Sequence, residues 1–307
     1  MAFADYPPQE HLRLAQAYSP ANAQYIANKI RGGRNGRKGT EYENLYAAYA
    51  LAKILVDSCL ACAPHKWPSL FDQVPAFVDD LLIEAGNSYR YHQLKNVANI
   101  TWESGDHPLR VDFELQKGFS DSKKEPSPIT IAVVSSPVVK ASLDETIPKS
   151  IADHTEVEHF PFFNSLNRLV QEFEPLRNAL SMLARTEQPS LDEMEYALSA
   201  LARAFMHQPG GGHASALLEK AQKATPGLLR LFPHQLSNLK LDTDFKTVLA
   251  KIPDFEYGCD RGFFSWKYHN DSGVLEYHCL NPQFDRFQRD IVKANPQTFD
   301  EIEGYLL

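Results

Sequence analysis

The part of the sequence that decides the fold lies between residues 39 and 96. It consists of three stretches: Gly39-Thr40-Glu41-Tyr42-Glu43, Val78-Asp79-Asp80-Leu81-Leu82-Ile83 and His92-Gln93-Leu94-Lys95-Asn96. The first stretch begins a helix predicted over residues 40–60, which is apolar nearly all round and is therefore expected to be buried. The second and third are predicted to be strands over residues 78–85 and 89–94, joined in a hairpin by a turn at Gly86-Asn87.

The remaining periodicities place further strands and then helices around this hairpin. Residues 109–116 alternate between apolar and polar, which predicts a half-buried strand, and the β-branched run over 129–135 predicts a strand covered on both faces. Helical spacing follows over residues 162–184, 190–206, 214–223 and 245–252, with a late hairpin over 262–279. We therefore expect an α/β domain in residues 1–155, with a mixed sheet flanked by helices, and a mainly helical accessory domain in residues 156–307.

Composition narrows the class of protein. The chain has 307 residues, a net charge of −8 and four cysteines, which argue against a disulfide framework at this length. It contains no apolar run long enough to span a membrane, and its first residues lack the pattern of a signal peptide. A cytoplasmic protein with no membrane association is the expectation.

Acidic and amide side chains gather in the deciding stretches. Gln93 and Lys95 are two residues apart on one predicted strand and therefore share a face, and the tight hairpin allows Asp80 to meet Gln93. A carboxylate from the start of the preceding helix would complete an oxygen-rich group of the kind that holds Mg²⁺, and a nearby lysine would offset negative charge. Helical periodicity does not choose between Glu41 and Glu43.

At the start of the first hairpin strand, side-chain alternation likewise leaves Asp79 and Asp80 as alternatives. Phosphodiester cleavage needs an activated water and neutralised charge at the phosphate, and a divalent cation held by carboxylates supplies both. The pattern of residues therefore favours a metal-dependent phosphodiesterase.

The three stretches together resemble the restriction-endonuclease-like superfamily with the PD-(D/E)xK signature. The likeness is to its Gln-x-Lys subset, which includes Mrr-like restriction enzymes and effector nucleases of bacterial anti-phage defence. The resemblance covers about residues 30–140 and implies a restriction-endonuclease-like sheet and a magnesium-dependent DNA endonuclease, with Mn²⁺ as an alternative ion. By motif match, Glu43, Asp80 and Gln93 would bind the metal and Lys95 would assist the attacking water.

A basic, glycine-rich segment precedes the first helix. Arg31, Arg34, Arg37 and Lys38 lie in it without an acid, and we expect them to bind backbone phosphates, of DNA rather than RNA. Cutting both strands of a duplex needs two sites, so a homo-oligomer is expected. Residues 156–307 are the candidate region for a protein partner.

Other functions remain alternatives at this point. The signature's leading proline is absent and Gln93 stands where an acid is usual, so the chain is alternatively a non-catalytic adaptor or sensor subunit that keeps a nuclease fold. Cys59 and Cys62 have the spacing of zinc ligands but end an apolar helix, which favours packing. A small zinc knuckle is the less favoured interpretation of four residues around the late hairpin: Cys259, His269, His278 and Cys279.

Overall fold

The computed structural model describes residues 9–20, 25–26, 41–58, 64–237 and 239–306. Some of the predicted features therefore lie outside the described residues. These are the basic segment with Arg31, Arg34, Arg37 and Lys38, and the cysteines Cys59 and Cys62. The sequence also predicts a polar helix over residues 9–31, in two pieces that break near Ser19-Pro20. The first piece is confirmed as α1 (Gln9–Tyr18), and most of the second lies outside the described residues.

Within the described residues, six strands form a mixed sheet in the order β5-β4-β3-β2-β1-β6. The strands are β1 (Ser69–Asp72), β2 (Leu81–Ala85), β3 (Ser88–Lys95), β4 (Ile129–Val134), β5 (Thr155–His159) and β6 (Gly212–His213). Strands β1, β2, β3 and β6 pair antiparallel, whereas β3, β4 and β5 run parallel. The predicted hairpin and the predicted strand over 129–135 are confirmed, and the α/β class with a mixed sheet holds.

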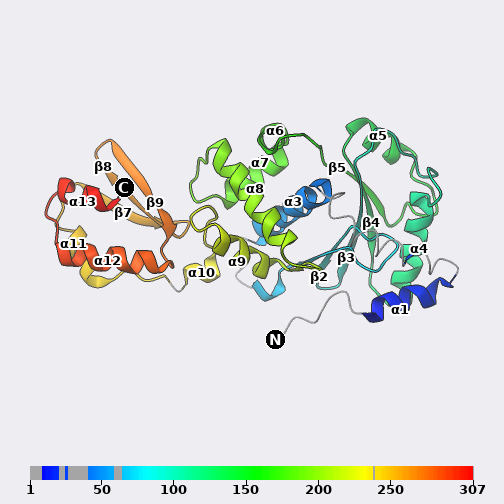
Figure 1. The fold of residues 1–307 in the computed structure, drawn as a ribbon, viewed down its shortest axis with the longest axis horizontal. Helices are drawn as coiled ribbons and strands as arrows, with labels where there is room; N and C mark the ends of the chain where they lie inside the picture. Colours follow the sequence, from blue (N-terminus) through cyan, green and yellow to red (C-terminus); the bar gives the residue numbers. More distant parts are fainter. Residues whose placement is uncertain (1–8, 21–24, 27–40, 59–63, 238, 307) are drawn as a thin grey trace.

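Helices cover both faces of this sheet (Figure 1). Successive side chains of a strand point to opposite faces of the sheet. Leu81 packs in the core with α3 (Glu41–Ser58), whereas its neighbour Leu82 packs in the core with α4 (Leu109–Ser122) and α5 (Pro137–Glu145). Ile131 and Ala132 of β4 divide between the two cores in the same way. A strand buried on both faces reads as a continuous apolar run, as β4 does.

The prediction of a strand over residues 109–116 is wrong, because this segment is the first half of α4. Its buried side chains recur at helical spacing and include Leu109, Asp112, Phe113 and Gln116. Two of these core-facing residues, Asp112 and Gln116, are polar, so the pattern of hydrophobic residues alone does not show the helical period. Gln116 is buried because its Oε1 accepts hydrogen bonds from the N–H groups of Phe77 and Val78, at 3.0 and 3.2 Å.

Four helices that follow β5 form one core with α3. They are α6 (Leu166–Glu172), α7 (Glu174–Leu183), α8 (Leu191–Met206) and α9 (Ala214–Ala224), as helical spacing predicts. Their buried residues belong to the same apolar cluster as those of α3. The boundary drawn at residue 155 falls at the first residue of β5, and both the sheet and this core continue past it.

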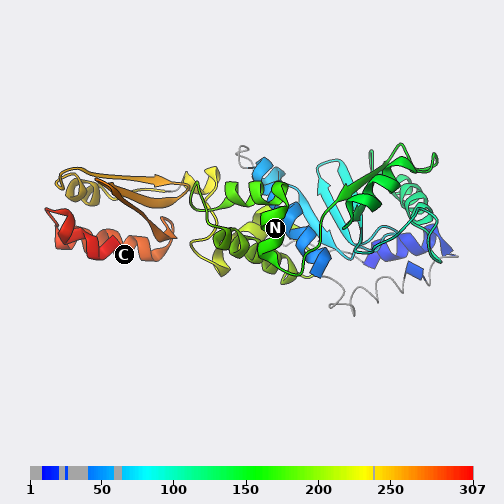
Figure 2. The same cartoon turned by 90° about the horizontal axis from the view of Figure 1, so that it is seen from above.

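A smaller unit forms the far end of the molecule (Figures 1 and 2). Within the described residues, its antiparallel sheet has three strands, of which the first was not predicted: β7 (Phe255–Asp260), β8 (Phe263–Tyr268) and β9 (Asp271–His278). Two longer helices, α12 (Pro282–Ala294) and α13 (Phe299–Leu306), and the short α11 (Thr243–Leu249) pack on it around a separate core.

Short helical turns complete the path of the chain: a 3-10 helix at Pro64–Lys66 and α10 (Pro233–Leu236). The smaller unit is fixed to the helices by Arg261, which lies in the turn between β7 and β8. One guanidinium nitrogen of Arg261, Nη1, donates to the carbonyl oxygens of Ser181, Ala184 and Thr186, each at 3.1 Å. These carbonyls lie at and beyond the end of α7, where backbone acceptors lack intrahelical donors.

Candidate active site

Glu43 lies in the first turn of α3, a position where helix geometry favours an acid. Glu41 is exposed, whereas Glu43 is partly buried and its Oε2 accepts a hydrogen bond from Gln73 Nε2 at 3.4 Å. Gln73 follows β1 directly and has a left-handed backbone, with φ of 48°. Of the two glutamates that periodicity could not separate, the structure therefore turns Glu43 toward the sheet.

Asp79 and Asp80 end the loop that joins β1 to β2. The loop folds back on itself, because the N–H of Val74 donates to the carbonyl of Asp79 at 3.0 Å. The hydrogen bonds from Phe77 and Val78 to Gln116 fix the same loop from the side of α4. Asp79 is buried, with 4% of its surface exposed, and Asp80 is partly exposed immediately before β2.

Gln93 and Lys95 lie near the end of β3, and Gln93 is in direct contact with Asp80. The side-chain amide of Gln93 donates to Asp80 Oδ2, and the backbone N–H of Leu94 donates to the same oxygen at 2.7 Å. This contact follows from the register, in which Leu81 pairs with His92. The N–H side of the Gln93 amide faces Asp80, so its carbonyl oxygen is directed away from that carboxylate.

The charges around Glu43 indicate how these side chains sit together. Burial, together with the negative charges of Asp80, Asp79 and Asp72, raises the pKa of Glu43 to about 8, and the positive charge of Lys95 opposes the shift. These groups therefore act on one carboxyl group from three different elements. Like charges held this close disfavour ionisation, and a bound cation would reverse that penalty.

Asp72, at the end of β1, was not singled out from the sequence. Burial raises its pKa, and backbone hydrogen bonds from Gly210 and from its own residue limit the shift. The register places it opposite Leu81, one residue after Asp80. Prolines and polar residues over 63–75 predict a loop, and this prediction is wrong for residues 69–72, which form β1 and bring Asp72 to this position.

The donor set suits a hard divalent cation. Carboxylate oxygens from Glu43 and Asp80 and an amide oxygen from Gln93 are ligands that Mg²⁺ accepts, and Mg²⁺ keeps several waters of its own. Among the residues that the structure describes, no group of three or more His, Cys, Asp and Glu side chains is arranged to hold a metal ion. A magnesium site here would therefore combine two carboxylates, one amide and water.

His92 is excluded from this group by its direction. Its ring packs against Tyr46 of α3, and its Nδ1 lies 3.2 Å from the carbonyl oxygen of Leu81. Burial lowers the pKa of His92 to about 4, so the imidazole is neutral at pH 7. Because side chains alternate along a strand, His92 and Lys95, three residues apart on β3, lie on opposite faces, which agrees with this packing.

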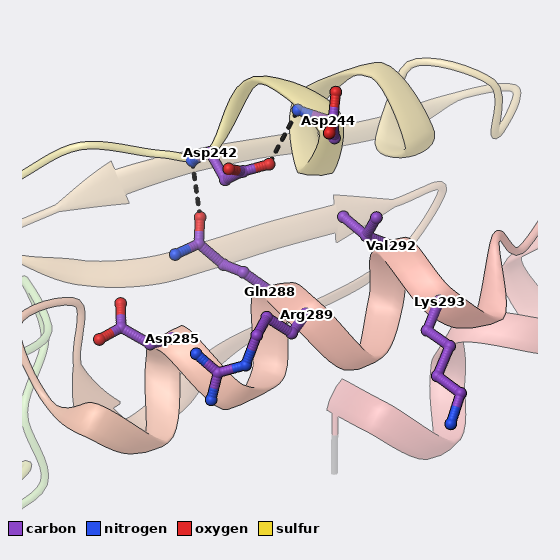
Figure 3. A pocket seen from close by; sticks show the side chains of 7 residues that line it. All are labelled: Asp242, Asp244, Asp285, Gln288, Arg289, Val292 and Lys293. Carbon is purple, nitrogen blue, oxygen red and sulfur yellow. Dashed lines mark hydrogen bonds between the residues drawn. The ribbon is translucent and has the colours of Figure 1, made fainter.

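Two hollows in the surface lie away from Glu43 and Asp80. One, of about 410 Å³, is lined by residues at the start of α11 and along α12 (Figure 3). Its polar groups already cap the backbone, because Gln288 Oε1 accepts from the N–H of Asp242 at 2.8 Å and Asp242 Oδ1 accepts from the N–H of Asp244 at 2.8 Å. The other, of about 470 Å³, lies between α9 and the start of α12.

The predicted alternatives for zinc find no support in the described part of the chain. Cys259 and Cys279 do approach each other, but they do not form a three-ligand group with His269 or His278. Within the same residues, no helix has both the length and the apolar content for crossing a membrane.

Comparison with known proteins adds no family assignment. The chain matches no protein-family model, no curated protein and no solved structure. The function of the chain is therefore inferred from its residues and their geometry.

Proposed function

We propose that this chain is a metal-dependent nuclease that hydrolyses phosphodiester bonds. The observation that carries the proposal is the contact between Asp80 and Gln93, with Glu43 close enough for its pKa to respond to Asp80 and to Lys95. The order α3-β1-β2-β3-α4-β4 around this group resembles the core expected of a restriction-endonuclease-like fold. Three sequence stretches and one contact geometry thus support the same chemistry.

Each side chain has a distinct role in this proposal. Glu43, Asp80 and the carbonyl oxygen of Gln93 would hold Mg²⁺ or Mn²⁺, which when bound lowers the pKa of water and offsets charge at the phosphate. The N–H groups of Gln93 and Leu94 orient the Asp80 carboxylate and keep its Oδ2 in place. The ammonium group of Lys95 orients the attacking water and stabilises negative charge that develops at the phosphate.

The proposed substrate is DNA, and a homo-oligomer would supply the second site needed for a double-strand cut. A role in defence against phage or foreign DNA and a protein partner bound through residues 156–307 belong to the same proposal. They follow from the resemblance of the three sequence stretches.

A specific observation favours a second candidate, a non-catalytic adaptor or sensor with this fold. Asp80 Oδ2 already accepts two hydrogen bonds, and within the described residues no three-ligand group of His, Cys, Asp and Glu is present. A fold retained only for binding would tolerate such an arrangement, because its carboxylate needs no metal.

Cleavage of supercoiled plasmid in Mg²⁺ or Mn²⁺ separates the two candidates. We expect wild type to cut, and Asp80→Asn and Lys95→Ala to lose about a hundredfold or more of the rate, as for removal of a charge-stabilising group. The matched controls are Asp144→Asn and Lys140→Ala, which remove the same charges from a surface pair on α5. Inertness of all five proteins on DNA, with a single-stranded RNA panel also uncut, would reject the nuclease and favour the adaptor.

A further inference from the structure

Two cysteines from different parts of the small C-terminal unit face each other. Cys259 lies on β7 and Cys279 follows β9 directly, twenty positions later, and their sulfur atoms are 3.5 Å apart. Both are free thiols, Cys279 buried and Cys259 partly exposed. The N–H of Cys279 donates to the carbonyl of Gly262 at 2.8 Å, which fixes its backbone beside the turn that leaves β7.

We propose that Cys259 and Cys279 form a reversible disulfide, so that this pair is an oxidisable site in the C-terminal unit. A disulfide needs a sulfur–sulfur distance of about 2.05 Å, so the two sulfurs must move about 1.5 Å closer than the 3.5 Å observed. Side-chain rotation accounts for movements of that size. Metal binding is the weaker interpretation, because within the described residues these thiols belong to no group of three potential ligands.

The surroundings of the two sulfur atoms differ, and they suit Cys259 as the attacking cysteine and Cys279 as the resolving one. The contact with Cys279 lowers the pKa of Cys259, and the same contact, together with burial, raises the pKa of Cys279. The thiolate is the reactive form of cysteine, and reaction also requires access to the oxidant. Cys259 has both the lowered pKa and the exposure, so it is the residue that reacts first.

The chemistry balances with a peroxide as the oxidant. The Cys259 thiolate attacks one oxygen of hydrogen peroxide; a sulfur–oxygen bond forms, the oxygen–oxygen bond breaks, and hydroxide leaves and is protonated to water. The Cys279 sulfur then attacks the sulfenic sulfur of Cys259. The sulfur–sulfur bond forms, the sulfur–oxygen bond breaks, and the thiol proton of Cys279 leaves with the hydroxyl group as a second water.

The proposed disulfide would lie close to the turn that anchors the small C-terminal unit to the helices. The disulfide would enclose the turn that carries Arg261, whose Nη1 donates to carbonyls of Ser181, Ala184 and Thr186. The carbonyl of Arg261 also accepts from the N–H of Leu231. Oxidation therefore constrains the segment that anchors the small unit to the helices, and we expect it to raise the temperature at which that segment becomes sensitive to protease.

The test uses the full chain with Cys59 and Cys62 replaced by serine, so that only the pair of interest remains. Reduced protein is treated with hydrogen peroxide, alkylated and mapped by peptide mass spectrometry. We expect both thiols to disappear together, a peptide linking 259 to 279 that is lighter by two hydrogens, and full reversal by dithiothreitol. In Cys279→Ser, Cys259 should instead accumulate a sulfenic acid that dimedone traps.

Several results would overturn the proposal. They are persistence of both thiols in peroxide, independent oxidation of each cysteine to sulfinic acid without a linked peptide, or stoichiometric capture of Zn²⁺ by the reduced pair with protection from peroxide. Mapping of the unmodified wild-type chain keeps the test valid if a serine variant fails to fold. None of these readouts depends on nuclease activity.

Discussion

Glu43 is a partly buried acid and Glu125 a buried one, near opposite ends of β3, and the protein surrounds the two carboxyl groups with opposite charges. Glu125 has 8% of its surface exposed, and each of its carboxylate oxygens accepts from the hydroxyl of Tyr91 at 2.9 Å. Its ion pair with Lys123 supplies a positive charge. Glu43 instead shares its surroundings with Asp80 and Asp79, and burial with their charges raises its pKa to about 8.

The difference separates a structural acid from a candidate functional one. A buried charge that is paired and hydrogen-bonded holds the fold together, and nothing further needs to bind it. A carboxyl group crowded by other acids is destabilised until a cation or a proton arrives, which is typical of functional sites. Substitutions at the two glutamates therefore test whether their roles differ in this way.

The largest effect is expected from the compensated acid. Glu125→Ala removes the partner of Lys123 and of the Tyr91 hydroxyl, and breaking a buried pair on one side costs about 3–5 kcal/mol. Urea denaturation measures this loss, with Asp144→Ala as the control, because its pair with Lys140 is on the surface. A cost for Glu125→Ala no larger than that of the control would show that Glu125 is not a structural acid.

The next effect concerns the loop that presents Asp79 and Asp80. Gln116→Leu keeps the volume of the side chain but leaves the N–H groups of Phe77 and Val78 without their acceptor, which costs about 1–3 kcal/mol. We expect lower stability in urea together with a slower plasmid-cleavage rate. Gln283→Leu, on the exposed face of α12, is the control and should change neither quantity. Loss of stability with an unchanged rate would separate this loop from the proposed site.

The polar residue Gln116 also shows why part of the fold could not be predicted from the sequence. The hairpin of β2 and β3 could be predicted because two runs of apolar and aromatic residues, over 78–85 and 89–94, flank a turn at Gly86-Asn87. Helix α4 could not, because Asp112 and Gln116 occupy its core-facing stripe and are buried through hydrogen bonds to distant residues. Periodicity of hydrophobicity carries no information about a polar residue whose partner is far away in the sequence.

The candidate site likewise has one part that could be predicted from the sequence and another that could not. The contact between Asp80 and Gln93 could be predicted, because a tight hairpin fixes the register of the two strands. The choice of Glu43 over Glu41 could not, because α3 is buried nearly all round and periodicity shows no solvent face. The position of Asp72 could not be predicted either, because it lies in a short strand between prolines. Only the tertiary arrangement brings it near Glu43.

A smaller effect is expected from the uncompensated acid, with a characteristic dependence on pH. A carboxyl group whose pKa is raised from 4.5 to about 8 in the folded state stabilises the fold below its unfolded value and loses that contribution as pH rises through 8. Without metal, Glu43→Gln should therefore match wild type near pH 5 and become more stable than it by about 1–3 kcal/mol near pH 9. Urea midpoints across this range measure the difference. A constant difference would mean that the pKa of Glu43 is not raised in the folded chain.

The smallest effect is the stabilisation of the folded chain by divalent ions at pH 8. A ligand that binds only the folded state raises the free energy of unfolding by about 1 kcal/mol when its concentration is about fivefold the dissociation constant. Mg²⁺ should raise the melting temperature of wild type but not of Glu43→Gln or Asp80→Asn. Glu125→Gln, which keeps a hydrogen-bonding side chain at the structural acid, should respond to Mg²⁺ as wild type does, from a lower starting temperature. If Mg²⁺ instead stabilised Glu43→Gln as much as wild type, the ion would bind elsewhere, and the contrast between the two glutamates would carry no functional meaning.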